Sequence, residues 1–145
     1  MKEKILLSAC LLGKACRYDG RSVPCDKALL LEEKYDIIPI CPEVEGGLPT
    51  PRIPSERIGE RVMNKAGEDV TENYLVGAQA ALGICKSQNV RLAVLKERSP
   101  SCGCREIYDG SFSGRLVSGV GVTVELLKSH GVEVLGESEI DKLLK

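Results

Sequence analysis

The sequence lacks tryptophan and contains only one phenylalanine and one histidine. This scarcity of aromatic side chains disfavours the stacked platforms on which proteins bind single-stranded nucleic acid. A strong charge of either sign is also missing, because the 145 residues carry a formal net charge of −1. The charge balance therefore indicates no electrostatic attraction to nucleic acid or to an anionic membrane. We expect neither a nucleic-acid polymer nor a membrane as a partner, and the sequence does not indicate the oligomeric state.

Long hydrophobic runs are missing as well. The N-terminal segment MKEKILLSACLLGK contains an apolar run that is too short for a signal peptide, and no later segment is long enough to span a bilayer. A cytoplasmic protein is therefore expected. A chain of this length buries about 70% of its unfolded surface, so we expect one domain over residues 1–145.

Short apolar runs alternate with segments of helical spacing. KILLSAC, YDIIPIC, RLAVLK and VEVLG predict buried strands. Helices are predicted between and after these strands, at residues 26–35, 71–88, 120–131 and 139–145. This alternation predicts an α/β fold with three layers: a mainly parallel, Rossmann-like sheet with helices on both faces.

Two segments do not follow this alternation. Residues 42–60 are rich in proline and glycine and have no evident core positions, which in a compact domain is more often a functional excursion than filler. A short hairpin is predicted directly after it, around Asn64 to Gly67. Residues 107–119 are rich in glycine and predict a turn around Asp109 and Gly110.

The seven cysteines are the most informative feature of the composition. An odd number of cysteines without a signal peptide favours metal binding or catalysis over a disulfide framework. Cys10, Cys41 and Cys102 each follow a predicted strand. Because the carboxyl ends of parallel strands lie along one edge of a sheet, these three thiols are expected to meet there. The simplest common purpose of three thiols at one edge is a metal site.

The spacing of the cysteines narrows the kind of metal. Structural zinc usually takes four ligands from close Cys-x-x-Cys pairs, and the sequence has no such pair. Three separated thiolates fit an iron–sulfur cluster in which one iron has no protein ligand, and such an open iron suggests chemistry rather than electron transfer. Cys104 is an alternative fourth ligand that would close the cluster. Cys85 is expected in the core, and Cys16 and Cys25 in a loop from which Cys16 could face the site.

Several polar residues lie near these cysteines. Glu43 and Glu45 follow Cys41, and either could be a general acid or base. Two serines, Ser99 and Ser101, flank Pro100, and a hydroxyl there could hold a substrate or water or cap the turn. Two arginines, Arg52 and Arg17, are candidates for binding an anionic group. The single histidine, His130, is explained by the dipole of the helix that it ends.

The sequence resembles the thiouracil desulfidases, a family of bacterial and archaeal proteins, over nearly its whole length. The segments that carry the resemblance are SACLLGKACRYDG, CPEVEGGLPTPR, NKAGEDVT, LKERSPSCG, IYDGSFSG and GVGVT, in this order. Among them, SACLLG, CPE and SPSCG are specific in combination.

The resemblance implies a [4Fe–4S] cluster held by three cysteines, which correspond to Cys10, Cys41 and Cys102. The fourth iron would bind the sulfur of a thiolated pyrimidine such as 4-thiouracil, its nucleoside or its nucleotide. The implied reaction is a non-redox desulfuration that releases hydrosulfide and uracil. The family's catalytic glutamate and serine are carried onto Glu45 and Ser101, with Glu43 and Ser99 as second choices.

Two other classes of function remain open at this point. One is an iron–sulfur protein without turnover, such as a sulfur carrier or a sensor, which would have four thiolate ligands. The other is a cysteine-dependent phosphatase or arsenate reductase. Its phosphate loop places five residues between cysteine and arginine, whereas CLLGKACR places six between Cys10 and Arg17.

Overall fold

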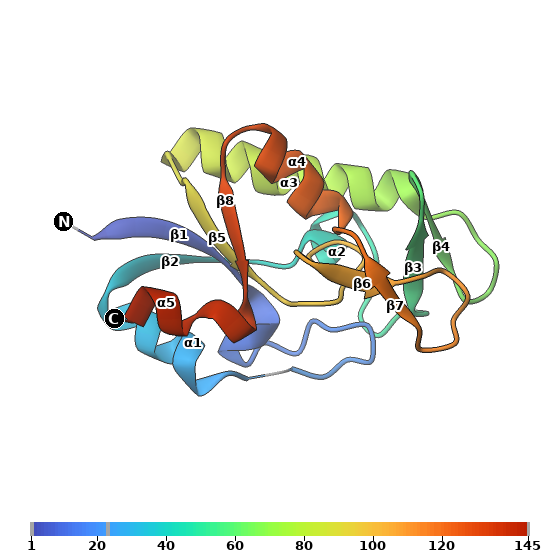
Figure 1. Ribbon diagram of the computed structural model, residues 1–145, viewed down its shortest axis with the longest axis horizontal. Helices are drawn as coiled ribbons and strands as arrows, with labels where there is room; N and C mark the ends of the chain where they lie inside the picture. The colour runs from blue at the N-terminus through green and yellow to red at the C-terminus, as the bar shows by residue number, and fades with distance from the viewer. Residues whose placement is uncertain (1, 23, 145) are drawn as a thin grey trace.

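The computed structural model describes residues 2–22 and 24–144, and its centre is a four-stranded sheet (Figure 1). The strands lie in the order β2-β1-β5-β8, and all three neighbouring pairs are parallel. Their bounds are β1 Glu3–Ser8, β2 Tyr35–Ile40, β5 Leu92–Leu95 and β8 Glu133–Gly136. The predicted parallel sheet is thus confirmed.

Helices cover both faces of the sheet (Figure 1). On one face, residues of α3 and α4 pack against Leu6 and Ala93, and on the other, residues of α1 and the segment before α5 pack against Leu7 and Val94. Successive strand residues point to opposite faces, so apolar runs such as ILLS supply both cores. The helices span α1 Asp26–Leu30, α2 Pro42–Glu45, α3 Thr71–Gln88, α4 Val122–Ser129 and α5 Asp141–Leu144, with short 3₁₀ helices η1 Ala9–Leu12, η2 Leu31–Glu33 and η3 Glu137–Glu139.

Two antiparallel hairpins lie beyond the sheet. They are β3 Ser55–Ile58 with β4 Arg61–Asn64, and β6 Glu106–Tyr108 with β7 Leu116–Ser118. The first of these hairpins, which the sequence did not predict, turns at Gly59 and Glu60, where Gly59 has a φ of 59°. The predicted turn around Asn64 to Gly67 is confirmed as a separate turn after β4, closed by an antiparallel bridge between Met63 and Asp69.

The proline- and glycine-rich segment 42–60 has more structure than its composition predicts, because it contains α2 and β3. Helix α2 stacks directly on α3, and two glycines permit the contact. A β-carbon at Gly77 of α3 would lie 1.9 Å from the carbonyl oxygen of Pro42, and one at Gly46 would lie 1.9 Å from that of Asn73. This close packing fixes α2 at the carboxyl end of β2.

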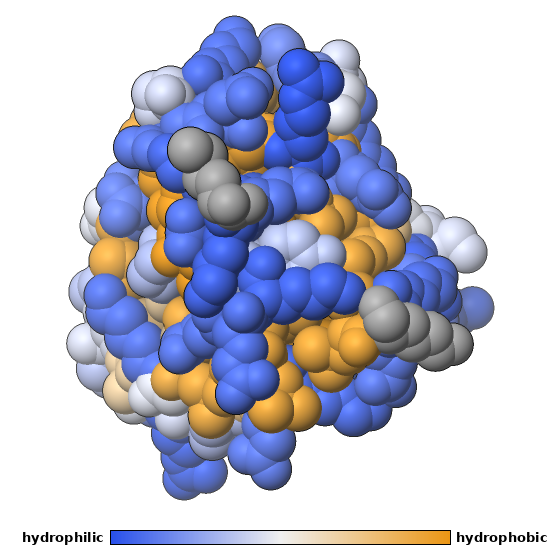
Figure 2. Space-filling view, turned by 90° about the vertical axis from the view of Figure 1, so that its left-hand side faces the viewer, coloured by the Kyte–Doolittle hydropathy of each residue, from blue (hydrophilic) through white to orange (hydrophobic). Residues whose placement is uncertain are grey.

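The side of the molecule on which both termini lie is mostly hydrophilic, with apolar residues among the charged ones (Figure 2). Such a mixture is ordinary for a protein surface in contact with water. Among residues 2–22 and 24–144, no helix is both long and apolar enough to cross a membrane. The expected cytoplasmic location stays a prediction.

Candidate active site

A pocket of about 570 Å³ opens at the carboxyl edge of the sheet. It is lined by residues that follow β1, β2 and β5. The strand order reverses between β1 and β5, because β1 is followed by β2 on one side and β5 by β8 on the other. Open α/β sheets bind their ligands at such a switch point. Four thiols line the pocket: Cys10, Cys16, Cys41 and Cys102. The three cysteines predicted to meet at this edge therefore do so, and Cys16, for which the sequence allows this position, joins them.

Cys16 links two of the other thiols. The thiol of Cys16 contacts those of Cys10 and Cys41, and the Sγ of Cys41 also donates to the backbone carbonyl of Cys16 over 3.7 Å. The contact with Cys16, together with burial, raises the pKa of Cys41 far above its ordinary value. Burial, with the negative charge of Glu43, raises the pKa of Cys102 to about 12.

The chemistry of this donor set fits an iron–sulfur cluster. Because these pKa values are raised, Cys41 and Cys102 are neutral thiols unless a cation stabilises their thiolates. A bound metal supplies that charge, since a coordinating thiol loses its proton. Sulfur-rich sites favour iron–sulfur clusters and soft metals over magnesium or calcium.

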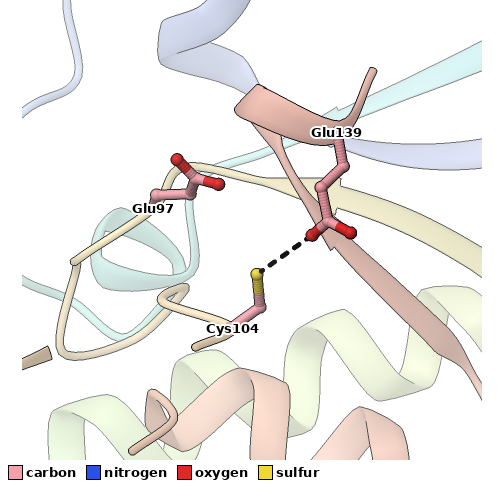
Figure 3. Close-up of side chains that lie close together, drawn as sticks. All are labelled: Glu97, Cys104 and Glu139. Atoms are coloured by element: carbon pink, nitrogen blue, oxygen red, sulfur yellow. Dashed lines mark hydrogen bonds between the residues drawn. The ribbon is translucent and has the colours of Figure 1, made fainter. Parts of the chain in front are cut away.

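Cys104 does not line the thiol pocket, and its Sγ lies within 4.8 Å of carboxylate oxygens of Glu97, which does line the pocket, and of Glu139, which does not (Figure 3). Its Sγ donates to Oε1 of Glu139 over 3.9 Å. Burial opposes the charge of Glu139, but Lys142, the Gly136 N–H and Arg105 lower its pKa to about 2. Because this carboxylate is already matched by cations, the group does not need a metal, and Cys104 is not placed to join the other thiols.

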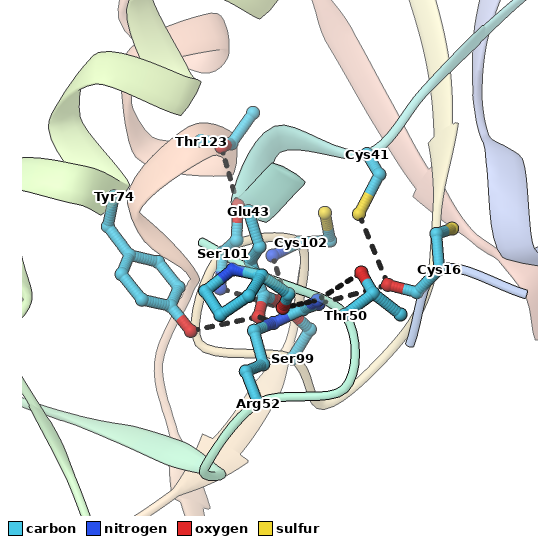
Figure 4. A network of polar contacts seen from close by, with 11 residues as sticks. Cys16, Cys41, Glu43, Thr50, Arg52, Tyr74, Ser99, Ser101, Cys102 and Thr123 are labelled. Carbon is cyan, nitrogen blue, oxygen red and sulfur yellow. Dashed lines mark hydrogen bonds and ion pairs between the residues drawn. The ribbon is translucent and has the colours of Figure 1, made fainter. Parts of the chain in front are cut away.

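A carboxylate with three side-chain donors lies beside the thiols (Figure 4). The Oε2 atom of Glu43 accepts from Nε of Arg52 and from the hydroxyl of Tyr74, both over 3.0 Å. Its Oε1 atom accepts from the hydroxyl of Ser99 over 3.2 Å. The side chain of Glu43 is only 15% exposed, so these contacts hold a negative charge inside the pocket in one orientation.

Arg52 connects this carboxylate to the cysteine loop. Its Nη2 donates to the carbonyl of Cys16 over 3.1 Å, and its Nη1 donates to the carbonyl of Pro49 and the hydroxyl of Thr50. The side chain of Arg52 is 5% exposed, and Nε, Nη1 and Nη2 all have partners. The structure therefore does not support the expected binding of an anionic group by Arg52.

Arg17 also lines the pocket, but its geometry does not indicate a role. It lies 3.8 Å from the carboxylate of Asp19 and above the ring of Tyr18, 5.6 Å from its centroid. Its expected contact with an anionic group stays a prediction.

Glu45 and Ser101 do not reach the pocket. Glu45 ends α2 and is exposed, because residues two apart on a helix point about 200° away from each other and Glu43 faces inward. Ser101 is fully buried, and its hydroxyl shares a 2.7 Å hydrogen bond with that of Thr123. The geometry thus favours the second choices, Glu43 and Ser99, over the first.

The sequence did not indicate three aromatic residues that also line the pocket, Tyr74, Tyr108 and Phe112. The ring of Tyr74 is buried in an apolar cluster with Val62 and Ala78, but its hydroxyl donates to Glu43. Only the proximity of α2 and α3 reveals this contact. Phe112 could have been noticed as the single phenylalanine in a turn rich in glycine and serine.

The chain is similar to proteins of one family over almost its full length. The model of a family described as 2-thiouracil desulfurase matches residues 5–139. An uncharacterised protein of Bacillus subtilis (strain 168), YbbK, is 41% identical over 150 residues, which cover 97% of this chain and 99% of that protein. A solved structure named [4Fe-4S]-dependent thiouracil desulfidase TudS is 48% identical with a TM-score of 0.93, and the match covers 99% of this chain and 96% of that one.

Proposed function

Because the chain belongs to the 2-thiouracil desulfurase family, we propose that it is an enzyme that removes sulfur from a thiolated pyrimidine by hydrolysis. The substrate is 4-thiouracil or a similar base, nucleoside or nucleotide. Water replaces the sulfur on the ring carbon, so the products are uracil and hydrosulfide and no electron is transferred. The observation that carries the proposal is that Glu43, Ser99 and several thiols share one pocket.

The name of the TudS structure supports a [4Fe–4S] cluster as the cofactor. Cys10, Cys41 and Cys102 would hold it, and Cys16 is the fourth thiol of the pocket. When bound, a cluster with three protein ligands supplies a Lewis-acidic iron that attracts a thiocarbonyl sulfur. The rest of the chemistry belongs to the side chains of the chain itself.

Glu43 is the proposed general base. Its two oxygens have different surroundings: Oε2 accepts from Arg52 and Tyr74, whereas Oε1 accepts, among the residues that the structure describes, only from the hydroxyl of Ser99. We propose that Oε1 accepts the proton of the attacking water, because this oxygen has fewer hydrogen-bond donors than Oε2. The same proton then returns to the departing sulfur.

Ser99 is the proposed positioning group for Glu43 and for water. Its Oγ accepts from the backbone N–H groups of Ser101 and Cys102, over 3.1 and 3.2 Å. Since both of these contacts use the oxygen as acceptor, the hydroxyl hydrogen is left to point at Glu43. The hydroxyl therefore ties the base to the backbone of a proposed cluster ligand.

An anaerobic assay of sulfide release tests this function. Protein reconstituted with iron and sulfide is incubated with 4-thiouracil, 4-thiouridine or 4-thiouridine monophosphate, and sulfide and the oxygenated product are both quantified. We expect many turnovers, with one sulfide for each uracil ring formed. Sulfur that accumulates on the protein only once per chain would instead indicate a carrier, and no loss of thiocarbonyl from any of the three would refute the proposal.

A further inference from the structure

The loop between β6 and β7, residues 109–115, forms part of the pocket wall. Tyr108, Phe112 and Gly114 all line the pocket, together with Ser55 and Glu56 of β3. Phe112 is the only phenylalanine of the chain and is partly buried. The proposed reaction chemistry uses none of these residues.

The backbone of Phe112 has an unusual conformation. Its φ is 57°, in the left-handed region that normally favours glycine or asparagine. A bulky side chain persists in such a conformation only when its surroundings determine it, and such residues cluster at functional sites. Phe112 is flanked by two residues on each side that are glycine or serine. A bulky aromatic side chain is therefore the unusual feature of this loop.

Glu56 supplies the contacts that hold this conformation. It is 9% exposed, and its Oε1 atom accepts from the backbone N–H groups of Gly110 and Phe112, over 2.9 and 3.1 Å. A β-carbon at Gly110 would lie 2.2 Å from Cγ1 of Ile58, so the loop rests directly on β3. A buried carboxylate thus fixes both ends of the segment that presents Phe112.

We propose that Phe112 is the wall against which the pyrimidine ring of the substrate lies, and that Glu56 is the positioning residue that holds this wall. The inference rests on the proposed function, since it names the group that recognises the flat ring of that substrate. Glu43 and the thiols supply polar and sulfur contacts, whereas the ring faces need an apolar, planar partner. Stacking on an aromatic side chain provides one for any pyrimidine.

Substitutions at Phe112 test the wall. In the iron-loaded protein, Phe112→Ala should raise the KM for 4-thiouracil and the Kd for uracil, the latter by calorimetry, roughly 5- to 100-fold, with kcat changed little. Phe112→Tyr restores a planar ring and should restore both constants, whereas Phe112→Leu keeps apolar bulk without a planar face and should not. An unchanged KM and Kd in Phe112→Ala would overturn the wall.

The positioning role of Glu56 is tested by a conservative substitution and by a double variant with Phe112. Glu56→Ala should raise KM and Kd as Phe112→Ala does, and Glu56→Gln, which keeps an acceptor oxygen, should recover most of the loss. The double variant Glu56→Ala/Phe112→Ala should bind no worse than Phe112→Ala alone, because the two residues act through one wall. Additive losses would reject the positioning role, and if Glu56→Ala does not fold, Glu56→Asp, whose shorter side chain should not reach the N–H groups of Gly110 and Phe112, takes its place in the same comparison.

Two controls keep the inference separate from the proposed function. Val117→Ala changes an exposed residue of β7 that does not line the pocket and should leave KM and Kd unchanged. An unsubstituted protein that releases no sulfide and binds no uracil would refute the proposed function. If the protein is active but neither Phe112→Ala nor Glu56→Ala changes its KM or Kd, the proposed role of Phe112 is refuted and the proposed function is not.

Discussion

Gly77 of α3 lies against the backbone carbonyl of Pro42, so close that a β-carbon on Gly77 would stand 1.9 Å from the carbonyl oxygen. Glu43 is the next residue along the chain, and Tyr74, which donates to it, lies one helical turn before Gly77. The contact between these two backbones therefore sets the distance between the proposed base and one of its donors.

This contact predicts opposite effects for two glycines of the same helix. Gly77→Ala should destabilise the protein by about 1–3 kcal/mol, as overpacking of a closed contact does, and should slow sulfide release by displacing Glu43. Gly83→Ala should instead stabilise it by about 0.5–1 kcal/mol, because no atom lies within 4 Å of the new β-carbon and alanine favours helices. Urea unfolding measures both, and equal effects would contradict the packing argument.

The two glutamates after Cys41 are distinguished by exchange of each for glutamine. Glu43→Gln keeps the size of the side chain but removes the base, so we expect sulfide release to fall at least about 100-fold with the iron content unchanged. Glu45→Gln is the matched control, and because Glu45 is exposed outside the pocket, its activity should stay near that of the unsubstituted protein. The reverse pattern would return the role to Glu45.

The cysteines are distinguished by iron content after anaerobic reconstitution. Cys104→Ser should keep its iron and its visible absorption, since the thiol faces Glu139 and not the pocket. Cys41→Ser and Cys102→Ser should lose most of their iron. The pair Cys10→Ser and Cys16→Ser shows which of these two contacting thiols is the third ligand, and we expect the loss at Cys10.

Arg52 is expected to act on the base rather than on the substrate. Its loss leaves the carboxylate of Glu43 buried without its ion pair, so Arg52→Met should lower stability by about 3 kcal/mol and reduce kcat. The reduction should be equal for 4-thiouracil and for 4-thiouridine monophosphate. A loss confined to the monophosphate would show that Arg52 binds phosphate.

The lowered pKa of Glu139 predicts how the stability of the protein depends on pH. Its pKa falls from an ordinary value of about 4.5 to about 2, so it stabilises the fold fully above pH 4.5, and this contribution is lost as the pH falls towards 2. Glu139→Gln should therefore cost about 1–2 kcal/mol at pH 7, since its exposed partners Arg105 and Lys142 are screened by water. Urea unfolding at pH 7 and pH 3 should show the difference between the two proteins shrinking at the lower pH.

The placement of the thiols could be predicted from the sequence because it follows from topology. Parallel strands end at one edge, so three cysteines that each follow a strand meet there whatever the details of the loops. Cys16 follows no strand. Its position depends on the path of residues 13–22, which long-range contacts such as that from the Arg52 N–H to the carbonyl of Tyr18 help to set.

The choice between neighbouring polar residues could not be predicted in the same way. Glu43 and Glu45 are equivalent in a loop rich in proline and glycine, and only the single turn of helix α2 turns one inward and the other outward. Similarly, Ser99 and Ser101 flank the same proline, but Thr123 of α4 captures the hydroxyl of Ser101. The turn of α2 distinguishes the two glutamates, and the contact with Thr123 distinguishes the two serines. Neither can be predicted from composition or spacing.

The spread of the thiols over three strand ends also has a consequence for biosynthesis. During translation Cys10 and Cys41 leave the ribosome well before Cys102, and the pocket cannot close until β5 has paired with β1. A nascent chain that ends before β5 therefore lacks part of the proposed ligand set. If these three thiols hold a cluster, its assembly is completed only after β5 has paired with β1.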